Sequence, residues 1–174
     1  MPPNPGPIAA IESALMSEED AISAYKVAVT RASAILDIRR FGEFLRMHQN
    51  AACDLSRVRA RLLAKVGTWG HPWDAGRLPP GAAQRVGAAL DEVGMFEVLA
   101  AAEKQHANKV VTLLVGTESD LPRDAYMLLE RIVAETDEHQ AWLNERASGV
   151  TVTNAAPTSI ARAPGPLAVV VQGW

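Results

Sequence analysis

Proline placement is the feature that most constrains this chain, because a proline inside a helix costs about 3 kcal/mol. Eleven prolines occur among the 174 residues, and they leave three long proline-free windows at 8–71, 81–121 and 123–156. These windows are rich in Ala, Leu, Glu and Arg and contain little Gly, which is the composition of helices. No alternating strand pattern competes with this periodicity. The sequence therefore predicts an all-α fold.

The first window is too long for one ordinary globular helix. The segment from Ser33 to Asp37 offers a weak turn or N-cap signal at which it divides. Gly67, Gly116 and Gly149 follow apolar periodic runs, as C-cap glycines do. Four helices are predicted in consequence, over residues 8–33, 37–66, 81–115 and 121–148.

The connections between these helices predict how they are arranged. Those near 33–37 and 116–121 are short, so helices one and two, and helices three and four, are expected to form antiparallel hairpins. Residues 67–80 form a 14-residue connection, which spans up to about 45 Å at about 3.3 Å per residue. A long crossover between two hairpins is the ferritin-like form of an antiparallel four-helix bundle. The expected organisation is an extended segment 1–7, a bundle 8–149 and a tail 150–174.

Composition excludes several classes of protein. Seventeen Lys and Arg against twenty Asp and Glu give a net charge of −3, so the basic excess that nucleic-acid phosphates require is missing. No run approaches the roughly 20 apolar residues of a membrane span. Cys53 is the only cysteine, which excludes an internal disulfide and a Cys-rich metal cluster. The first residues have no basic n-region or apolar h-region, so we expect a cytoplasmic protein without nucleic-acid or membrane partners.

The most informative residues interrupt the apolar stripes of the predicted helices. Each stripe follows steps of three and four residues, and each contains one carboxylate or imidazole at a core position. These interrupting residues are Glu18, His48, Glu103 and His139. An unpaired ionised carboxylate is costly to bury or is forced to take up a proton. The four residues therefore need partners.

Helical geometry adds two candidates to this set. Glu103 and His106 lie about 60° apart around a helix, and Glu135 and His139 about 40° apart, so each pair can share a face. Carboxylate oxygens with neutral imidazole nitrogens suit Fe, Mn or Zn, and inward Glu with Glu-x-x-His on facing helices is the carboxylate-bridged dimetal arrangement. The opposing interpretation is a set of satisfied core polar groups held by neighbours or water.

From Ile132 to Leu143 the sequence is IVAETDEHQAWL, which resembles the last bundle helix of bacterioferritins and rubrerythrin-like proteins. That helix carries Glu-x-x-His followed by a Trp-Leu pair. Glu18 and Tyr25, seven residues apart, are similar to the Glu and downstream Tyr of the superfamily's first helix. Glu103 precedes His139 by 36 residues, a spacing similar to that between the third-helix Glu and fourth-helix His. The resemblance implies a ferritin-like, di-iron carboxylate type of bundle.

The chain departs from the superfamily pattern at the two bridging positions. The bridging Glu lies three residues before each His, and Leu45 and Thr136 occupy those positions here. Glu135 is adjacent to one of them, and Glu103-Lys-Gln-His106 supplies an additional Glu-x-x-His. No carboxylate replaces the one missing at Leu45. The resemblance therefore implies a degenerate member with a depleted site that holds one metal, an atypical pair or none.

Two hypotheses of function follow. The first is a ferritin-like metal-binding protein of iron or oxidative-stress handling, in which Fe or Mn is expected and Zn fits less well; the resemblance leaves ferroxidase-like oxidoreductase activity open. Its ligands would be Glu18, His48, Glu103 and His139, with Glu135 and His106 as further candidates. The second is a non-catalytic bundle that acts as a structural or cargo protein, in which Glu18 pairs with His48, and Glu103 with His139 or His106.

Partners are predicted from two further segments. Related bundles dimerise or build larger shells, and Ala100–Ala102 permits close helix approach, so we expect a homo-oligomer. In the tail, prolines exclude a continuous helix, and Leu167–Val171 with Trp174 forms a short apolar end. This end either covers a groove of the bundle or a sister subunit, or it docks to a partner through residues 163–174. Its layout is similar to that of ferritin-like proteins loaded into nanocompartment shells.

Overall fold

The computed structural model describes residues 6–66, 81–117 and 120–149, and all the regular secondary structure in these ranges is helical. The elements are α1 (Pro7–Arg31), α2 (Ile35–Lys65), α3 (Ala82–Ala88), α4 (Glu92–Thr117) and α5 (Arg123–Ala147). The all-α prediction is confirmed. None of the described helices is both long and apolar enough to cross a membrane. The predicted crossover 67–80, the tail 150–174 and most of the segment 1–7 lie outside the described residues.

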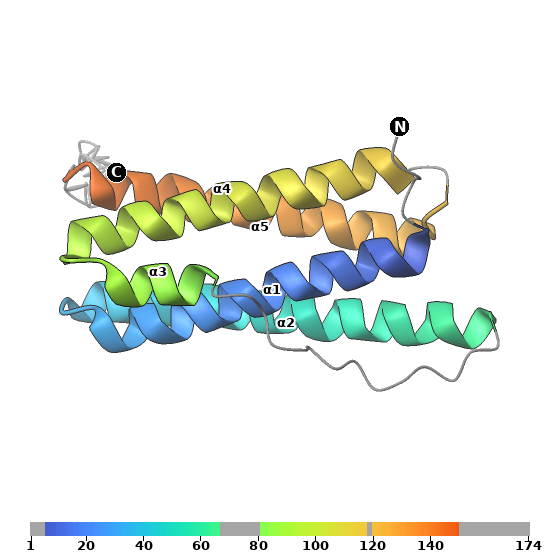
Figure 1. Ribbon diagram of the computed structural model, residues 1–174, viewed down its shortest axis with the longest axis horizontal. Helices are drawn as coiled ribbons and strands as arrows, with labels where there is room; N and C mark the ends of the chain where they lie inside the picture. The colour runs from blue at the N-terminus through green and yellow to red at the C-terminus, as the bar shows by residue number, and fades with distance from the viewer. Residues whose placement is uncertain (1–5, 67–80, 118–119, 150–174) are drawn as a thin grey trace, which may run out of the picture.

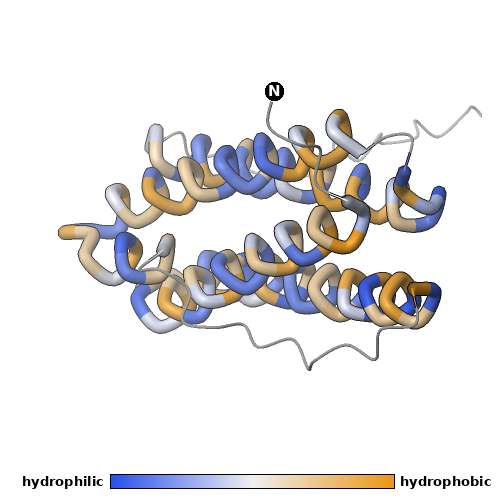
Figure 2. The backbone as a smooth tube through the Cα atoms, turned by 45° about the vertical axis from the view of Figure 1, so that its right-hand side comes forward, coloured by the Kyte–Doolittle hydropathy of each residue, from blue (hydrophilic) through white to orange (hydrophobic). Residues whose placement is uncertain are grey.

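The four long helices lie side by side, with α3 against two of them (Figure 1). The strongest pairings are α1 with α2 and α4 with α5, and α1 also contacts α4 while α2 contacts α5. Each long helix therefore has two long neighbours, and the four enclose a common interior. The short helix α3 packs against α1 and α4. Apolar residues recur at intervals along every long helix, as this shared interior requires (Figure 2).

The turn between α1 and α2 lies slightly earlier than predicted. Helix α1 begins at Pro7, where a proline is tolerated because the first-turn amide has no partner within the helix. It ends where Ala32 adopts an extended conformation, and α2 begins at Ile35. Asp37 is therefore inside the first turn of α2, where its buried carboxylate accepts a hydrogen bond from Arg146 at 2.5 Å.

The prediction of one helix over 81–115 is wrong, because the chain breaks at Ala89 into α3 and α4. Ala89 has an extended ψ of 134°, and the guanidinium of Arg31 donates hydrogen bonds to three carbonyls at the end of α3. At the start of α4, Asp91 Oδ1 accepts a hydrogen bond from the amide of Gly94 at 2.7 Å, which is an N-cap interaction. Side chains therefore supply hydrogen-bond partners for the carbonyls at the end of α3 and for an amide at the start of α4.

Two apolar clusters fill the interior. The first includes Ile11, Leu15, Leu55, Val110, Leu129 and Ile132. The second includes Tyr25, Phe41, Phe44, Phe96, Leu99 and Leu143. Along each of the four long helices, buried polar residues separate the part in the first cluster from the part in the second; these residues are Glu18, His48, Glu103, His106, Thr136 and His139. The polar residues therefore form one layer between two apolar ones.

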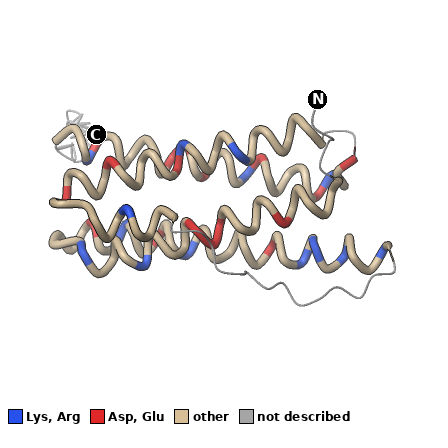
Figure 3. Tube along the Cα trace, in the orientation of Figure 1, with Lys and Arg blue, Asp and Glu red and all other residues tan. Residues whose placement is uncertain are grey.

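Residues of both charge signs are distributed along the helices (Figure 3). The basic stretch near the end of α2 contains Arg57, Arg59 and Arg61, and each of them forms an ion pair with an acidic side chain of α1, α2 or α5. The pairs formed by Arg57 and Arg61 are exposed and contribute little to stability. Because its charges are paired, this stretch is an ordinary solvated helix face.

Candidate metal centre

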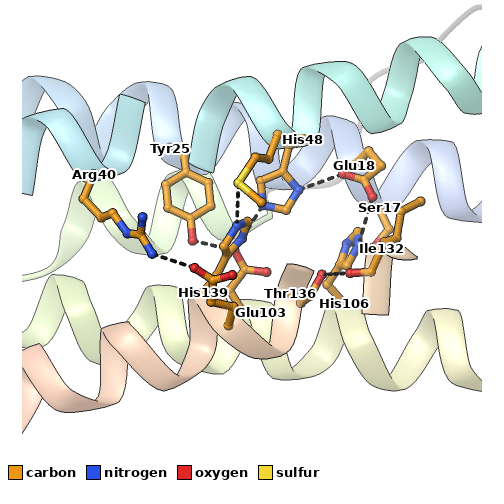
Figure 4. A network of polar contacts seen from close by, with 12 residues as sticks. Ser17, Glu18, Tyr25, Arg40, His48, Glu103, His106, Ile132, Thr136 and His139 are labelled. Carbon is orange, nitrogen blue, oxygen red and sulfur yellow. Dashed lines mark hydrogen bonds and ion pairs between the residues drawn. The ribbon is translucent and has the colours of Figure 1, made fainter. Parts of the chain in front are cut away.

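The structure brings five of the six predicted ligand residues into one buried cluster (Figure 4). The members are Glu18 from α1, His48 from α2, Glu103 and His106 from α4, and His139 from α5. None of them is more than 4% exposed. The sixth residue, Glu135, is not brought to the cluster. Its side chain is 29% exposed and lies 3.6 Å from the guanidinium of Arg131.

His48 lies at the centre of the cluster between two carboxylates. Its Nδ1 is 2.7 Å from Glu18 Oε2, and its Nε2 is 3.1 Å from Glu103 Oε1. Burial by itself lowers the pKa of this imidazole, but the hydrogen bonds and negative charges of the two carboxylates outweigh burial and raise the pKa to about 10. Both ring nitrogens therefore carry protons at neutral pH, and the ring is an imidazolium.

The two oxygens of Glu103 have very different surroundings. Tyr25 donates a hydrogen bond to Oε1 at 2.5 Å, and nitrogens of His48 and His139 lie 3.1 and 3.4 Å from that same oxygen. Among the described residues, Oε2 has no hydrogen-bond partner. Burial raises the pKa of Glu103, but the contacts with His139 and His48 reverse the shift and hold it far below its usual range. Glu103 is therefore ionised.

Tyr25 stays protonated and acts as a donor. Its ring is fully buried, and burial together with the Glu103 carboxylate raises the pKa of the hydroxyl well above its usual value. The ring packs against those of Phe41, Phe44 and His48, with centroids 6.0, 5.7 and 5.3 Å away. The aromatic layer thus fixes the donor that holds one oxygen of Glu103.

Glu18 and His106 form the second part of the cluster. Glu18 Oε1 is 3.1 Å from His106 Nε2, without the geometry of a hydrogen bond, and neither atom has another partner among the described residues. The other ring nitrogen, Nδ1, is 2.8 Å from Ser17 Oγ, which fixes the orientation of the ring. Burial raises the pKa of Glu18, but the contacts with His106 and His48 lower it overall, so this carboxylate is ionised as well.

His139 is held by contacts that sequence reasoning did not anticipate. Its Nε2 is 3.4 Å from Met47 Sδ, and its ring lies 3.9 Å from that of Phe44, centroid to centroid. Its Nδ1 has no hydrogen-bond partner among the described residues. The predicted site did not include Ser17 or Met47, because a serine or methionine beside an inward residue carries no distinctive signal in the sequence.

The two positions that lack bridging carboxylates contribute no ligand. Thr136 is buried, but its hydroxyl donates to the carbonyl of Ile132 in its own helix at 2.7 Å. Leu45 is partly buried and packs against the second apolar cluster. The ligand set therefore consists of two carboxylates and three imidazoles.

This set of donors fits a divalent metal ion. Two groups place their ligand atoms within 4.8 Å of one another; they are Glu18, His48 and His106, and His48, Glu103 and His139. Two ligands about 2.1 Å from one ion, at about 90–110° to each other, lie about 3.0–3.4 Å apart. The carboxylate–imidazole distances of 3.1 Å in the first group and 3.4 Å in the second match this separation.

Because both groups share His48, the cluster favours one ion over two. A neutral imidazole has a single lone pair, so His48 can ligate in one group at a time. The charge of the cluster also favours one ion over two. With neutral imidazoles the two carboxylates carry a charge of −2, which one divalent cation balances.

Comparison with protein families, with curated proteins and with solved structures found no match to this chain. The helices and the buried Glu and His groups are compatible with a ferritin-like fold. This compatibility rests on the helical structure and the buried Glu and His side chains, and not on a related protein.

Proposed function

We propose that this chain is a metal-binding protein with a ferritin-like four-helix bundle, whose buried cluster holds one divalent ion of iron or manganese. The ion would be held by His48 together with either Glu18 and His106 or Glu103 and His139. Mixed oxygen and nitrogen donors suit these metals. Zinc is the less favoured metal, because the ferritin-like resemblance implies iron or manganese. The pairing of α1 with α2 and of α4 with α5 supports the bundle.

One observation carries this proposal. Four buried ligand atoms in the cluster have no hydrogen-bond partner among the described residues; they are Glu18 Oε1, Glu103 Oε2, His106 Nε2 and His139 Nδ1. Folded proteins leave few buried polar atoms unpaired, because each costs about 1–3 kcal/mol. All four atoms belong to side chains that ligate metals, and two come from each of the two candidate groups. A cation bound in one group would satisfy the two unpaired atoms of that group.

The surrounding residues would position the ligands and control protonation. Tyr25 holds Glu103 Oε1, while Ser17 orients His106. The rings of Phe41 and Phe44 are fully buried and exclude water from one side of the layer. His48 must release a proton before it ligates, so metal binding competes with protons. A bound iron or manganese ion would supply Lewis acidity and redox chemistry.

A second candidate function is a bundle in which the same residues form a structural network. It is favoured by the contacts from Glu18 through His48 to Glu103 and Tyr25, which are connected without any ion. In that function the polar layer would fix the register of the helices and the protein would act through its surface. The two candidates differ in whether the cluster needs a cation to be stable.

Metal analysis of protein purified without a His tag tests the proposal directly. We expect iron and manganese to total about one equivalent, and the thermal midpoint of metal-stripped protein to rise when either metal is added. Less than about 0.2 equivalents of Fe, Mn and Zn together, with no rise in thermal midpoint on metal addition, would overturn the proposal.

A matched pair of variants separates the two candidate functions. Glu103→Gln keeps the shape of the side chain and some of its hydrogen bonding but weakens ligation. Glu130→Gln makes the same change at an exposed position of α5 and serves as the control. Loss of metal in Glu103→Gln but not in Glu130→Gln supports the metal site. Equal metal content in the two variants supports the structural network; a loss of stability of Glu103→Gln in metal-free buffer is expected from either function, because Glu103 contacts Tyr25, His48 and His139 without an ion.

A further inference from the structure

One end of the bundle carries a group of exposed aliphatic side chains. Ile35 and Leu36 begin α2 and are 76% and 72% exposed, while Leu90 and Val93, at the start of α4, are 100% and 48% exposed. Single exposed apolar residues are ordinary, but a group of them marks a surface that another segment or molecule covers. We call these four residues the apolar end patch.

Hydrogen bonds hold the two halves of this patch together. Ser33, in the turn before α2, donates from its amide and from its hydroxyl to the two carboxylate oxygens of Glu92, at 3.0 Å each. Below the patch, Ala32 and Ala89 follow the last residues of α1 and α3, are only partly buried, and pack against the second apolar cluster. The patch therefore continues the apolar interior to the surface.

Helix α5 ends beside this patch. The guanidinium of Arg146, in its last turn, donates to the carboxylate of Asp37 in the first turn of α2 at 2.5 Å. The end of α5 lies at the same end of the bundle as the α1–α2 turn and the α3–α4 break (Figure 1). Gly149 follows the helix with a φ of 68°, the left-handed conformation that turns a chain at a helix C-terminus. The chain therefore leaves α5 next to the apolar end patch.

The sequence that follows Gly149 contains an uncharged, apolar stretch. Residues 167–171 are LAVVV and Trp174 comes soon after, without any Asp, Glu, Lys or Arg from Ala163 onward. Residues 150–166 separate this stretch from Gly149. Seventeen residues span up to about 56 Å, whereas neighbouring helices pack about 8–10 Å apart. The stretch can therefore reach every part of the patch.

We propose that residues 167–174 of this chain fold back and cover the apolar end patch. The leucine and valines of this stretch bury aliphatic area against Ile35, Leu36, Leu90 and Val93, and that burial drives the contact. Tethering holds the stretch at an effective concentration of about millimolar at the patch. A second copy of the chain, which is not tethered, does not compete at micromolar concentration. This contact needs no metal ion and goes beyond the proposed function.

A second surface fits the same stretch less well. A cavity of about 720 Å³ lies between α2 and α5, and Met127 in its wall is 56% exposed. The cavity wall also contains charged residues that form ion pairs with one another; they are Asp54, Arg57, Arg61, Asp124 and Arg131. An uncharged segment laid on these pairs would remove them from water without supplying a compensating charge. The end patch has no charged member.

Hydrogen–deuterium exchange of full-length protein, read by mass spectrometry over residues 167–174, tests the proposal. A synthetic peptide of the same sequence gives the unprotected rate. Ile35→Gln/Leu90→Gln makes the patch polar. Val115→Gln/Met127→Gln makes two such changes at exposed apolar positions of α4 and α5 outside the patch, and is the matched control. Val169→Gln/Val171→Gln alters the stretch itself and leaves the bundle unchanged.

We expect these residues to exchange about tenfold more slowly in full-length protein than in the peptide. The rate should approach that of the peptide in the patch variant and in the stretch variant, and stay slow in the control. Exchange of the wild type at the peptide rate would overturn the proposal and leave the stretch available to a partner. Equal protection in the patch variant and the control, or loss of protection in the control alone, would overturn it as well.

The dependence on concentration separates contact within one chain from contact between copies. Protection should be unchanged over about a hundredfold dilution, because a tethered contact does not depend on protein concentration. Protection that falls on dilution, together with a dimer in sedimentation, would assign the patch to a second copy and overturn the proposal. Circular dichroism checks that the variants fold, and the stretch variant decides the test if the patch variant does not.

Discussion

Tyr25→Phe is the most direct test of the buried cluster, because it removes one oxygen atom and leaves the ring in place. The hydroxyl donates to Glu103 Oε1 at 2.5 Å. The ring contacts with Phe41, Phe44 and His48 do not involve the hydroxyl, so phenylalanine preserves them. The variant therefore isolates one hydrogen bond to an ionised, buried carboxylate.

The expected loss follows from the surroundings of that carboxylate. A hydrogen bond to a charged group contributes about 1.5–3 kcal/mol. Glu103 Oε1 keeps its contacts with His48 and His139 in the variant, at 3.1 and 3.4 Å, so it is not left unpaired. We expect the free energy of unfolding of metal-free protein to fall by about 2 kcal/mol. For a chain of this length that corresponds to a drop of about 4–8 °C in thermal midpoint.

The assay is chemical denaturation of metal-stripped protein at neutral pH, with Tyr126→Phe as the control. Tyr126 is the other tyrosine and is partly buried in α5, and its hydroxyl forms no hydrogen bond with the described residues. Removing its hydroxyl should change the free energy of unfolding by less than about 0.5 kcal/mol. A change in Tyr25→Phe as small as that in the control would refute the hydrogen bond to Glu103.

Three further predictions concern the pH dependence of stability and the starts of α3 and α4. The stability of metal-free protein should be greatest between about pH 4.5 and 6.5. The raised pKa of His48 contributes stability that is lost as the pH rises from 6.5 through about 10. The lowered pKa of Glu103 contributes stability that is lost as the pH falls below 4.5. Urea titrations across this range measure it, and a flat profile would contradict it. Gly81→Ala should destabilise the start of α3, because an added Cβ would lie 1.9 Å from Asp20 Oδ1; amide exchange of α3 that is no faster would contradict this. Asp91→Ala should lower the free energy of unfolding by about 1 kcal/mol through loss of the α4 N-cap, and thermal melts measure the change.

Much of the helical framework was predictable because proline acts locally. Each predicted helix except the third matches an observed one within a few residues, since prolines and apolar periodicity depend on neighbouring residues alone. The break at Ala89 was not predicted for the opposite reason. It depends on Arg31, which lies 58 residues earlier in the chain and reaches the end of α3 only after folding.

The same distinction between local and long-range determinants explains which features of the buried cluster were predictable. Glu18, His48, Glu103 and His139 were predictable because each interrupts an apolar stripe on its own helix, and all four are buried. The sequence alone did not decide which carboxylate pairs with which imidazole. The structure gives His48 a contact with both carboxylates, whereas Glu103 approaches His139 and does not pair with His106. Such contacts depend on how the helices are rotated against one another.

The rotation of α5 decides the composition of the ligand set. Ile132, Thr136, His139 and Leu143 follow steps of four, three and four residues and are all at most 2% exposed, so Thr136 occupies the interior position and Glu135 lies outside it. A dimetal centre of this type draws four carboxylates from its four helices, enough to balance two divalent ions. In the ferritin-like bundle that we propose, Leu45 and Thr136 stand at two of these four positions, and the imidazole of His106 is an additional donor. The remaining charge of −2 balances one divalent ion, so a second ion would bring an uncompensated positive charge into a buried layer.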